Sequence, residues 1–396
     1  MIAPELVRIA DCCEIVAGAT PNTNVDSYWG GPIAWATPKD LSDLDGKYLS
    51  STPDTLTEEG YKSCSAKLMP AGSVLFSSRA PIGHVAINSV PMCTNQGFKS
   101  FVPDPTRVSA DYLYHWLKAN KAYLQSLGNG ATFKEVSKAV VSEIRIPLPP
   151  LTEQRRIAAI LDKADALRAK RRVAIAKLDQ LLQSVFLDMF GDAVTNPKAW
   201  PIIELGTLII DGPQNGLYKP ASDYGSGTPI LRIDGFRAGD VIDRLPSKRL
   251  RLDQAEIAKY RLRPADLVIN RVNSPEHLGK PALIGALSED VVFESNMMRL
   301  SVDQARVSPR YLLKCLLQKN VRDQISKRRK DAVNQSSINQ TDVGSLTIPL
   351  PPVAIQEKFA AIVDAASRQQ VRFEAATQAV GSMLGSMQQA TFSGAL

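Results

Sequence analysis

Side chains that bind polyanions and read nucleic-acid bases are concentrated in a few polar stretches of this sequence. The densest stretch runs from residue 321 to 330 and contains five cationic residues against the single acid Asp323. Arginine and lysine suit contacts with phosphate, whereas arginine with guanine, and asparagine or glutamine with adenine, distinguish bases in the major groove. The stretch therefore favours contact with DNA.

Related polar residues occur in other loops of both halves of the chain. The candidates for contact with double-stranded DNA are Ser77, Ser78, Arg79, Asn95, Gln96, Asn129, Lys134, Arg232, Asn270, Arg271, Asn273, Asn296, Lys327, Arg328, Arg329, Asn334 and Gln335. The alternative interpretation of any one of these residues is a solvated surface charge or an amide in a turn. Taken together, on the variable parts of a repeated scaffold, they favour DNA as the partner.

Motifs for catalysis or cofactor binding are absent from the sequence. There is no phosphate-binding Walker loop, no Gly-x-Gly cofactor loop, no Asn-Pro-Pro-aromatic base-methylation motif and no Cys/His zinc pattern. The five cysteines are odd in number and predict reduced thiols, mostly in the core. His84, His115 and His277 are isolated, which favours structural roles. We therefore expect no cofactor, no metal and no catalysis in this chain; the alternative is a site assembled from distant residues.

Composition and charge set the class of protein. At 396 residues the chain exceeds a single ordinary core, so two or more domains are expected. The net charge of +7 permits a polyanionic partner without requiring one. No apolar run approaches the roughly 20 residues of a membrane span, and no signal-peptide pattern is present, so the sequence predicts a cytoplasmic protein without a membrane partner.

An internal repeat organises the positions of these loops. The segment Ile-Pro-Leu-Pro-Pro occurs at 146–150 and again at 348–352, 202 positions later. The match continues without a gap, so that Gln154 answers Gln356. The chain therefore consists of two copies of one unit: a globular segment, a run of prolines and a long helix.

The two runs that follow the prolines predict helices. Residues 151–190 and 353–392 lack proline and are rich in Ala, Leu, Gln, Lys and Arg. The preceding prolines mark the start of each helix, and Gly191 is a suitable stop for the first. At 1.5 Å per residue, each helix would be roughly 60 Å long.

Apolar residues recur along both runs with a 3-4 spacing, in the same register. This heptad seam predicts that the two helices pair with each other, antiparallel, which would place the globular halves at opposite ends. The alternative is that each helix packs on its own half. The residues predicted to pair are Ile157, Ile160, Leu167, Leu178, Leu181, Val185, Phe359, Ile362, Phe373, Val380, Met383 and Met387.

The predicted organisation is an α+β protein with two pseudo-repeated mixed domains at 1–150 and 193–352 and long helices at 151–192 and 353–396. The second domain repeats the order of the first with weaker identity. Four alignments of the second domain on the first are predicted: 229–233 on 32–36, 262–269 on 68–75, 295–297 on 95–97, and 311–313 on 112–114.

The repeated Ile-Pro-Leu-Pro-Pro-x4-Gln segment, with a helix closing on Met-Phe-Gly or Thr-Phe-Ser-Gly, resembles the specificity subunit of type I restriction–modification systems. Residues 147–154, Pro-Leu-Pro-Pro-Leu-Thr-Glu-Gln, are a specific signature of that family, and residues 78–83 and 94–98 also look family-typical. The second copy departs from the pattern at Ala354-Ile355 and at Met297-Met298. The resemblance covers essentially the whole chain.

The resemblance implies a division of labour between subunits. Each target-recognition domain would read one half of a bipartite DNA target, and the paired helices would set the spacer and recruit two methylation subunits. S-adenosylmethionine would belong to those methylation subunits and ATP to additional restriction subunits. One alternative is the recognition subunit of another methylation-based phage-defence system without a nuclease. A coiled-coil scaffold without DNA binding is a third possibility.

Overall fold

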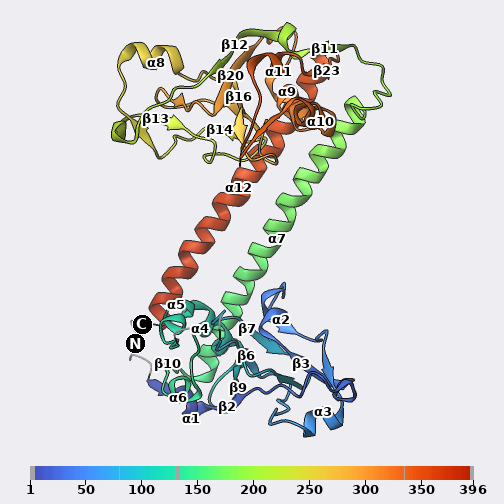
Figure 1. The fold of residues 1–396 in the computed structure, drawn as a ribbon. Helices are drawn as coiled ribbons and strands as arrows, with labels where there is room; N and C mark the ends of the chain where they lie inside the picture. The colour runs from blue at the N-terminus through green and yellow to red at the C-terminus, as the bar shows by residue number, and fades with distance from the viewer. Residues whose placement is uncertain (1–4, 80, 131–133, 334, 393–396) are drawn as a thin grey trace. The chain divides into compact units, whose positions relative to one another are not determined.

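The computed structural model describes residues 5–79, 81–130, 134–333 and 335–392, and its main elements are labelled in Figure 1. The chain forms two compact units: residues 1–173 with 374–396, and residues 174–373. We call residues 5–150 the first domain and residues 193–352 the second domain.

The first domain alternates short strands and helices. Its elements are β1 (Leu6–Arg8), α1 (Ile9–Cys12), β2 (Cys13–Ala17), the 3-10 helix η1 (Asp26–Tyr28), β3 (Trp29–Ala36), α2 (Pro38–Ser42), β4 (Tyr48–Leu49), β5 (Thr55–Leu56), α3 (Glu58–Lys62), β6 (Val74–Phe76), β7 (Val85–Asn88), β8 (Met92–Thr94), β9 (Lys99–Pro103), α4 (Ala110–Ala119), α5 (Lys121–Ser126), α6 (Lys138–Ser142) and β10 (Arg145–Pro147). They form sheets in the orders β2-β9-β6-β7-β4, β5-β3-β8 and β1-β10.

The second domain repeats this order and adds one sheet. Its elements are β11 (Ile202–Glu204), η2 (Leu205–Leu208), β12 (Ile209–Asn215), η3 (Ala221–Asp223), β13 (Tyr224–Leu231), β14 (Val241–Ile242), β15 (Arg249–Leu250), α8 (Gln254–Tyr260), β16 (Leu267–Asn270), β17 (Val272–Asn273), β18 (Pro281–Ile284), β19 (Val292–Phe293), β20 (Met297–Val302), α9 (Pro309–Leu316), α10 (Lys319–Arg328), β21 (Lys330–Ala332), β22 (Gln335–Ser337), α11 (Gln340–Gly344) and β23 (Thr347–Pro349). The sheets β12-β20-β16-β18-β14, β15-β13-β19 and β11-β23 match those of the first domain, and the additional sheet β17-β22-β21 takes the place of two single bridges there, Arg79–Glu135 and Asn129–Glu135.

The strand ladders show which residues of the two domains are equivalent. Leu267 of β16 corresponds to Val74 of β6, because each lies opposite matching strands on both sides. The turns before these strands agree, since Ala265 and Gly72 both have left-handed backbones with φ of +73° and +86°. The predicted alignment of this stretch is therefore wrong by one residue.

Two other predicted alignments are also shifted. The N–H of Arg271 donates to the carbonyl of Asn296 as the N–H of Ser78 donates to that of Gly97, so Asn296 corresponds to Gly97 and not to Gln96. On β13 the shift is two residues, because the N–H groups of Ile230 and Trp35 make matching bonds to the facing strand. Strands β6 and β16 are buried on both faces, so no alternation of apolar and polar residues fixes their register, and the hydrogen-bond ladder is needed to find it.

A buried glutamine fastens each domain to its long helix. The amide of Gln154 accepts the N–H of Ser109 at 2.8 Å and donates to the carbonyls of Arg107 and Pro149. Gln356 makes the same three contacts in the second domain. Nearby, buried Tyr112 and its counterpart donate their hydroxyls to Pro147 and Pro349, respectively. The proline segment is thus held in place by buried hydrogen bonds.

Helix α7 (Leu151–Phe190) begins and ends where the sequence predicted, and α12 (Val353–Phe392) begins where predicted and continues to Phe392, the last residue that the structure describes. Gly191 stops α7 with a left-handed backbone, φ +81°, and donates its N–H to the carbonyl of Leu187. In the first unit the beginning of α7 shares a core with Leu384, near the end of α12. In the second unit the end of α7 shares a core with Phe359, near the beginning of α12. The helices therefore run antiparallel.

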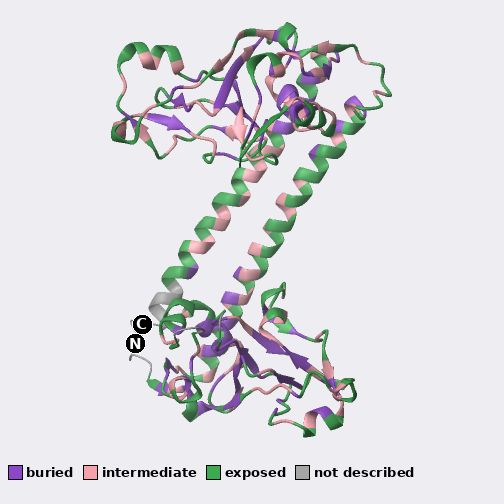
Figure 2. Cartoon of the chain, viewed as in Figure 1, coloured by how far each residue is buried: buried purple, intermediate pink, exposed green. Residues whose placement is uncertain are grey.

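Buried residues of α7 lie near its two ends, whereas residues 165–181 are half-buried or exposed (Figure 2). In the second unit the contact is aromatic: the rings of Phe186 and Phe190 lie 5.4 Å from the ring of Phe359. In the first unit Leu161 and Ala164 pack with Leu384 instead. Each helix therefore packs on its own domain and on the other helix.

The predicted seam is half correct. Ile157 and Phe359 are buried, Val185 and Val380 pack on the cores, and Ile160, Leu178 and Phe373 are half-buried. The side chain of Met387 lies outside the described residues. Four predicted pairing residues are exposed, which contradicts their assignment: Leu167, Leu181, Ile362 and Met383.

The register error has a simple physical reason. The buried stripe follows a 4-3 spacing through Ile157, Leu161 and Ala164, whereas a 3-4 spacing from the same start passes through Ile160. Successive residues on a helix lie about 100° apart, and both neighbours are apolar. Periodicity alone could not decide which of them faces the core, and the surrounding fold selected Leu161.

Candidate nucleic-acid interface

The loop after β6 in the first domain carries three predicted contact residues, two of which are enclosed. Ser77 and Ser78 are buried. The hydroxyl of Ser77 donates to the carbonyl of Pro81 and accepts the N–H of His84, both at 2.8 Å. These side chains shape the loop, so the prediction that they contact DNA is wrong.

Arg79 is exposed beside a small cluster of charges. Its guanidinium donates to Glu135 at 2.7 Å, and the amine of Lys99 donates to the same carboxylate at 3.1 Å. Partial burial tends to raise the pKa of Glu135, but these two cations outweigh it and lower the pKa. The backbone of Asn129 pairs with that of Glu135, which brings exposed Lys134 into the same surface.

The loop after β8 carries the other first-domain candidates. Asn95 is half-buried, and its side-chain oxygen accepts the N–H of Gly97 at 2.9 Å. Gln96 is exposed and hydrogen-bonded to Thr20. The carbonyl of Gly97 accepts the N–H groups of Ser78 and of its neighbour, so this loop and the loop of Arg79 form one surface.

In the second domain, the equivalent loops hold Asn270, Arg271, Asn273 and Asn296. Asn270 is buried, so the prediction that it contacts DNA is wrong. Arg271 is half-buried and donates to the carbonyl of Ser295 at 3.1 Å. Asn273 and Asn296 are half-buried, and the side-chain oxygen of Asn273 accepts the N–H of the next residue. The two loops are again joined, in this case through Asn296.

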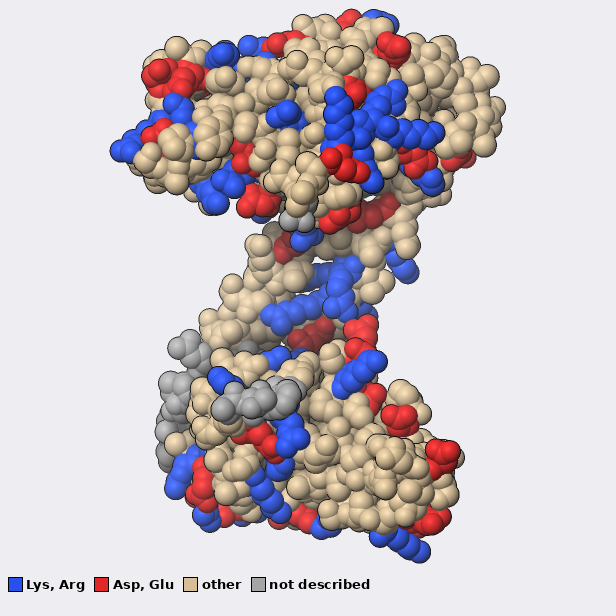
Figure 3. Space-filling view, in the orientation of Figure 1, with Lys and Arg blue, Asp and Glu red and all other residues tan. Residues whose placement is uncertain are grey.

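The additional sheet presents a hairpin, β21–β22, beside β17. Gln335 is exposed on β22, and Val333 between the strands is 91% exposed. Arg329 donates to Asp331 at 3.2 Å at the base of the hairpin. Exposed Lys327 lies at the end of α10, where Figure 3 shows a gathering of Lys and Arg. Asn334 lies outside the described residues.

Arg328 has a structural role that the sequence did not indicate. Its guanidinium donates to the hydroxyl and the carbonyl of Ser345 and to the carbonyl of Gln324, at 3.0–3.1 Å. It ties α10 to the residue that follows α11. Arg328 is half-buried, and its contact with DNA stays a prediction.

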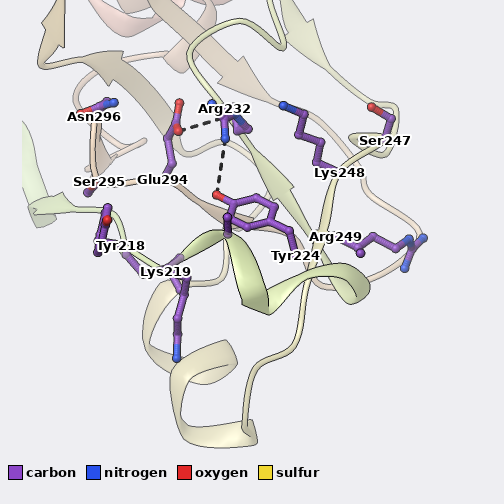
Figure 4. A pocket seen from close by; sticks show the side chains of 13 residues that line it. Tyr218, Lys219, Tyr224, Arg232, Ser247, Lys248, Arg249, Glu294, Ser295 and Asn296 are labelled. Atoms are coloured by element: carbon purple, nitrogen blue, oxygen red, sulfur yellow. Dashed lines mark hydrogen bonds and ion pairs between the residues drawn. The ribbon is translucent and has the colours of Figure 1, made fainter.

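A hollow of about 680 Å³ opens on the second domain beside Asn296 (Figure 4). Its lining converges from the segment after β12, from β13, from β15 and from the segment before β20. The polar and aromatic residues that line it are Tyr218, Lys219, Tyr224, Arg232, Ser247, Lys248, Arg249, Glu294, Ser295 and Asn296. Arg232 is the one predicted cation that the structure brings into this hollow with predicted Asn296.

The charges of the hollow are held by neighbouring acids. Arg232 lies 3.7 Å from buried Glu294, 3.6 Å from Asp234 and 3.5 Å from the hydroxyl of Tyr224. Burial opposes its charge, but these groups outweigh burial and raise the pKa of the guanidinium. Glu294 also accepts the N–H of Ile233 at 2.6 Å, which fixes its position.

At the rim, two cations are paired with acids, half-buried Glu256 and exposed Glu289. Lys219 lies 2.6 Å from Glu256, and Arg249 makes two bonds to Glu289 at 2.7 and 3.0 Å. The hydrogen bond that each cation donates to its acid raises the pKa of that cation. Among the residues that the structure describes, Lys248 has no ion-pair partner. The hollow is therefore basic and carries one unneutralised lysine.

Sequence reasoning missed the tyrosines of this hollow. Tyr218 is 81% exposed, and Tyr224 begins β13. A tyrosine next to Lys219 in a loop is a weak signal by itself. The convergence of four separate segments on one hollow was not visible in the sequence.

The structure also bears on metal and membrane sites. Within the described ranges, no group of three or more His, Cys, Asp or Glu side chains could hold a metal ion. None of the described helices has the length and apolarity needed to cross a membrane. Four of the five cysteines are buried, as predicted, and Cys64 is half-buried.

The sequence matches a family model described as the type I restriction modification DNA specificity domain, over residues 3–177 and 217–380. The chain belongs to this family. It is 28% identical over 385 residues to the MjaIX specificity subunit of Methanocaldococcus jannaschii, covering 91% of this chain and 85% of the relative. It is 25% identical to the EcoKI specificity subunit of Escherichia coli K12, covering 80% and 71% of the two chains.

Solved structures show the same fold. The S subunit of a type I system from M. genitalium aligns with a TM-score of 0.60 at 14% identity, covering 99% of this chain and 96% of that one. A chain from a structural study of assembly in a type I system aligns with a TM-score of 0.56 at 20% identity, covering 98% and 96%. The two matched segments of the family model contain most of both domains described above.

Proposed function

We propose that this chain is the sequence-recognition subunit of a type I restriction–modification complex and that each domain reads one half of a bipartite DNA target. The observation that carries the proposal is that the two domains share their sheets and buried contacts but differ in the residues of their exposed loops. Residues equivalent by the strand ladders share buried contacts, whereas the exposed positions differ in charge and type. Two frames of this kind suit two different half-sites on one duplex.

The second domain offers a projecting element for base reading. A two-stranded ribbon fits the major groove of B-form DNA, and β21–β22 is such a ribbon. Gln335 on the ribbon can pair with adenine, and Arg329 at its base can contact phosphate or guanine. In the first domain Arg79, Gln96 and Lys134 are the exposed candidates.

The long helices would set the distance between half-sites and recruit two methylation subunits. Support comes from apolar residues that α7 and α12 leave exposed. Leu167 and Leu181 lie two heptads apart on one face of α7, and Ile362 and Met383 lie three heptads apart on α12. Exposed apolar stripes of this kind suit docking of helices from a partner.

Catalysis and cofactors belong to partner subunits in this proposal. Methylation subunits would bind S-adenosylmethionine, and restriction subunits would use ATP. The described residues of this chain present a basic, hydrogen-bonding surface suited to binding. A second candidate, a recognition subunit that serves a methylase without a nuclease, would use the same surface, and co-purified partners distinguish the two.

Methylome sequencing tests the function directly. A host expressing this chain with its methylation subunit should acquire adenine methylation at two short defined sequences around an unspecified spacer. Removing seven residues from each long helix should change the spacer and leave both half-sites unchanged. A spacer that stays constant would contradict the ruler role, and a co-purifying complex that adds no methylation would contradict DNA reading.

A further inference from the structure

We propose that the hollow of the second domain binds the sugar-phosphate backbone of DNA and that the described residues of the first domain form no equivalent site. The proposal rests on the function proposed above and goes beyond it. It assigns most of the salt-dependent affinity for DNA to one domain of the pair.

The chemistry of the lining fits a phosphate. Lys219, Arg232, Lys248 and Arg249 reach the hollow from three separate segments, and Tyr218 and Tyr224 add hydroxyl groups (Figure 4). Lysine, arginine, tyrosine, serine and asparagine are the side chains that contact phosphate oxygens in protein–DNA complexes. A concave surface cannot enter a groove, so it suits the backbone that flanks the groove.

The position of the hollow also fits this role. Asn296 lines it, and the carbonyl of the same residue accepts the N–H groups of Arg271 and Val272 at 2.8 and 3.2 Å. Val272 begins β17, which pairs with β22 of the projecting hairpin. A duplex read by the hairpin would therefore pass close to the hollow.

The first domain holds different residues at the same positions. The N–H of Ile230 donates to the carbonyl of Lys248 as the N–H of Trp35 donates to that of Asp54, so Lys248 corresponds to Asp54. By the same register, Arg249 corresponds to a threonine. An acid and a neutral side chain thus replace two of the cations.

The residue of the first domain that is equivalent to Arg232 is a threonine whose hydroxyl already makes a hydrogen bond within the domain. Two residues after Ile230 and Trp35 lie Arg232 and Thr37, respectively, and the hydroxyl of Thr37 bonds to Asp40 at 2.8 Å in the cap of α2. Strand β3 carries no charged residue, and α3 carries two acids, Glu58 and Glu59, against the single cation Lys62. At these equivalent positions the described residues of the first domain therefore do not form a basic hollow.

The whole-domain charges follow the same division. Residues 1–150 contain 13 Lys and Arg against 14 Asp and Glu, a net charge of −1. Residues 193–352 contain 23 against 17, a net charge of +6. Counterion release scales with the number of phosphates neutralised, so the second domain is suited to dominate it.

The acids at the rim do not prevent binding. Glu289 is exposed and Glu256 is half-buried, and ion pairs that solvent reaches are weak, so a phosphate can replace both carboxylates. Glu294 differs because it is buried and holds Arg232 in position. Lys248 has no ion-pair partner among the described residues that a phosphate would have to replace, so it is the first residue to test.

The test measures how affinity depends on salt for the full chain with its methylation subunit, on a duplex that carries the methylated sequence. The double variant Lys248→Gln/Arg249→Gln should reduce the slope of log affinity against log salt by about 1.8, or about 0.9 per lost phosphate contact. The methylated sequence should stay the same. A matched loss of two exposed charges in the first domain, Lys62→Gln/Lys138→Gln, should leave the slope within about 0.3 of the original.

A gain-of-affinity variant gives a second, independent readout. Glu289→Gln removes the partner of Arg249 and should strengthen binding to duplexes of any sequence at low salt. Equal slopes for the two double variants, or no gain from Glu289→Gln, would overturn the phosphate site while sequence-specific methylation continued. Absence of sequence-specific binding in the original chain would instead overturn the proposed function, and the hollow proposal with it.

Discussion

The two domains are alike where they are buried and different where they are exposed. Gln154 and Gln356 make the same three hydrogen bonds, down to the bond with the proline five residues earlier. In contrast, Arg79 and Glu135 of the first domain correspond to Val272 and Ser337 of the second, by the register of their loops. The comparison teaches that the buried polar contacts preserve the frame and leave the loops free to diverge.

At the junction between each domain and a long helix, a cation of the domain is paired with an acid of the helix. In the first unit Lys47 lies 2.6 Å from Asp111 and 2.7 Å from Asp162 on α7. In the second unit Arg310 lies 2.6 Å from Asp364, the repeat of Asp162 on α12. The cation comes from different positions in the two domains, whereas the acid occupies the same position in both helices. Charge neutralisation is preserved without preservation of the residues.

Phe359→Ala should have the largest effect among single substitutions that test this comparison. It removes a buried ring from the cluster with Phe186 and Phe190, which costs about 3–5 kcal/mol of stability. The control, Ile362→Ala, lies on the predicted but exposed stripe and should change stability by less than about 0.5 kcal/mol. Hydrogen exchange of second-unit peptides measures both, because a chain of two units need not unfold in one step.

Gln154→Ala and Gln356→Ala should have smaller effects, equal to each other. Each leaves buried backbone groups without partners, which costs about 1–3 kcal/mol. Exchange measured separately in the two units should show a loss confined to the unit that carries the substitution. A difference of more than about 1 kcal/mol between the two would show that the frames are less alike than their hydrogen bonds indicate. Gln183→Ala, on the exposed face of α7, is the control.

Acidification should have the smallest effect and should separate the two units. Burial lowers the pKa of His115 below its ordinary value of 6.5, although its partner Asp162, at 2.7 Å, opposes the shift. The unfolded chain then binds the proton more readily, so this contribution to stability is complete above pH 6.5 and is lost as the pH falls toward the folded pKa. The equivalent residue of the second unit is Lys314, whose ordinary pKa is 10.5.

Thermal unfolding or exchange between pH 7 and 5 tests this difference. The first unit should lose stability through His115, and His115→Gln should remove that part of the pH dependence. An unchanged pH profile in His115→Gln would show that other groups control acid sensitivity. Lys47 and Asp165 also face this histidine, so their substitution should alter the midpoint of the effect.

The sequence by itself determined the architecture. The repeat at 202 residues, the proline segments and the proline-free runs predicted two domains, the starts of both long helices and the end of the first. These signals are local: proline cannot continue a helix, and Gly191 tolerates the left-handed backbone that ends one. The class of partner also followed from local residue types, since cations and amides in loops suit DNA.

Only the tertiary structure decided which side chains face outward. Ser77, Ser78 and Asn270 look like contact residues in the sequence, but the loops enclose them. Ile160 and Leu161 look equally suited to the helix seam, and the packing of the surrounding core buried the second. The hollow brings together four segments that are up to 79 positions apart, from Leu217 to Asn296. Contacts between distant segments depend on strand register and burial, and neither residue type nor spacing encodes them locally.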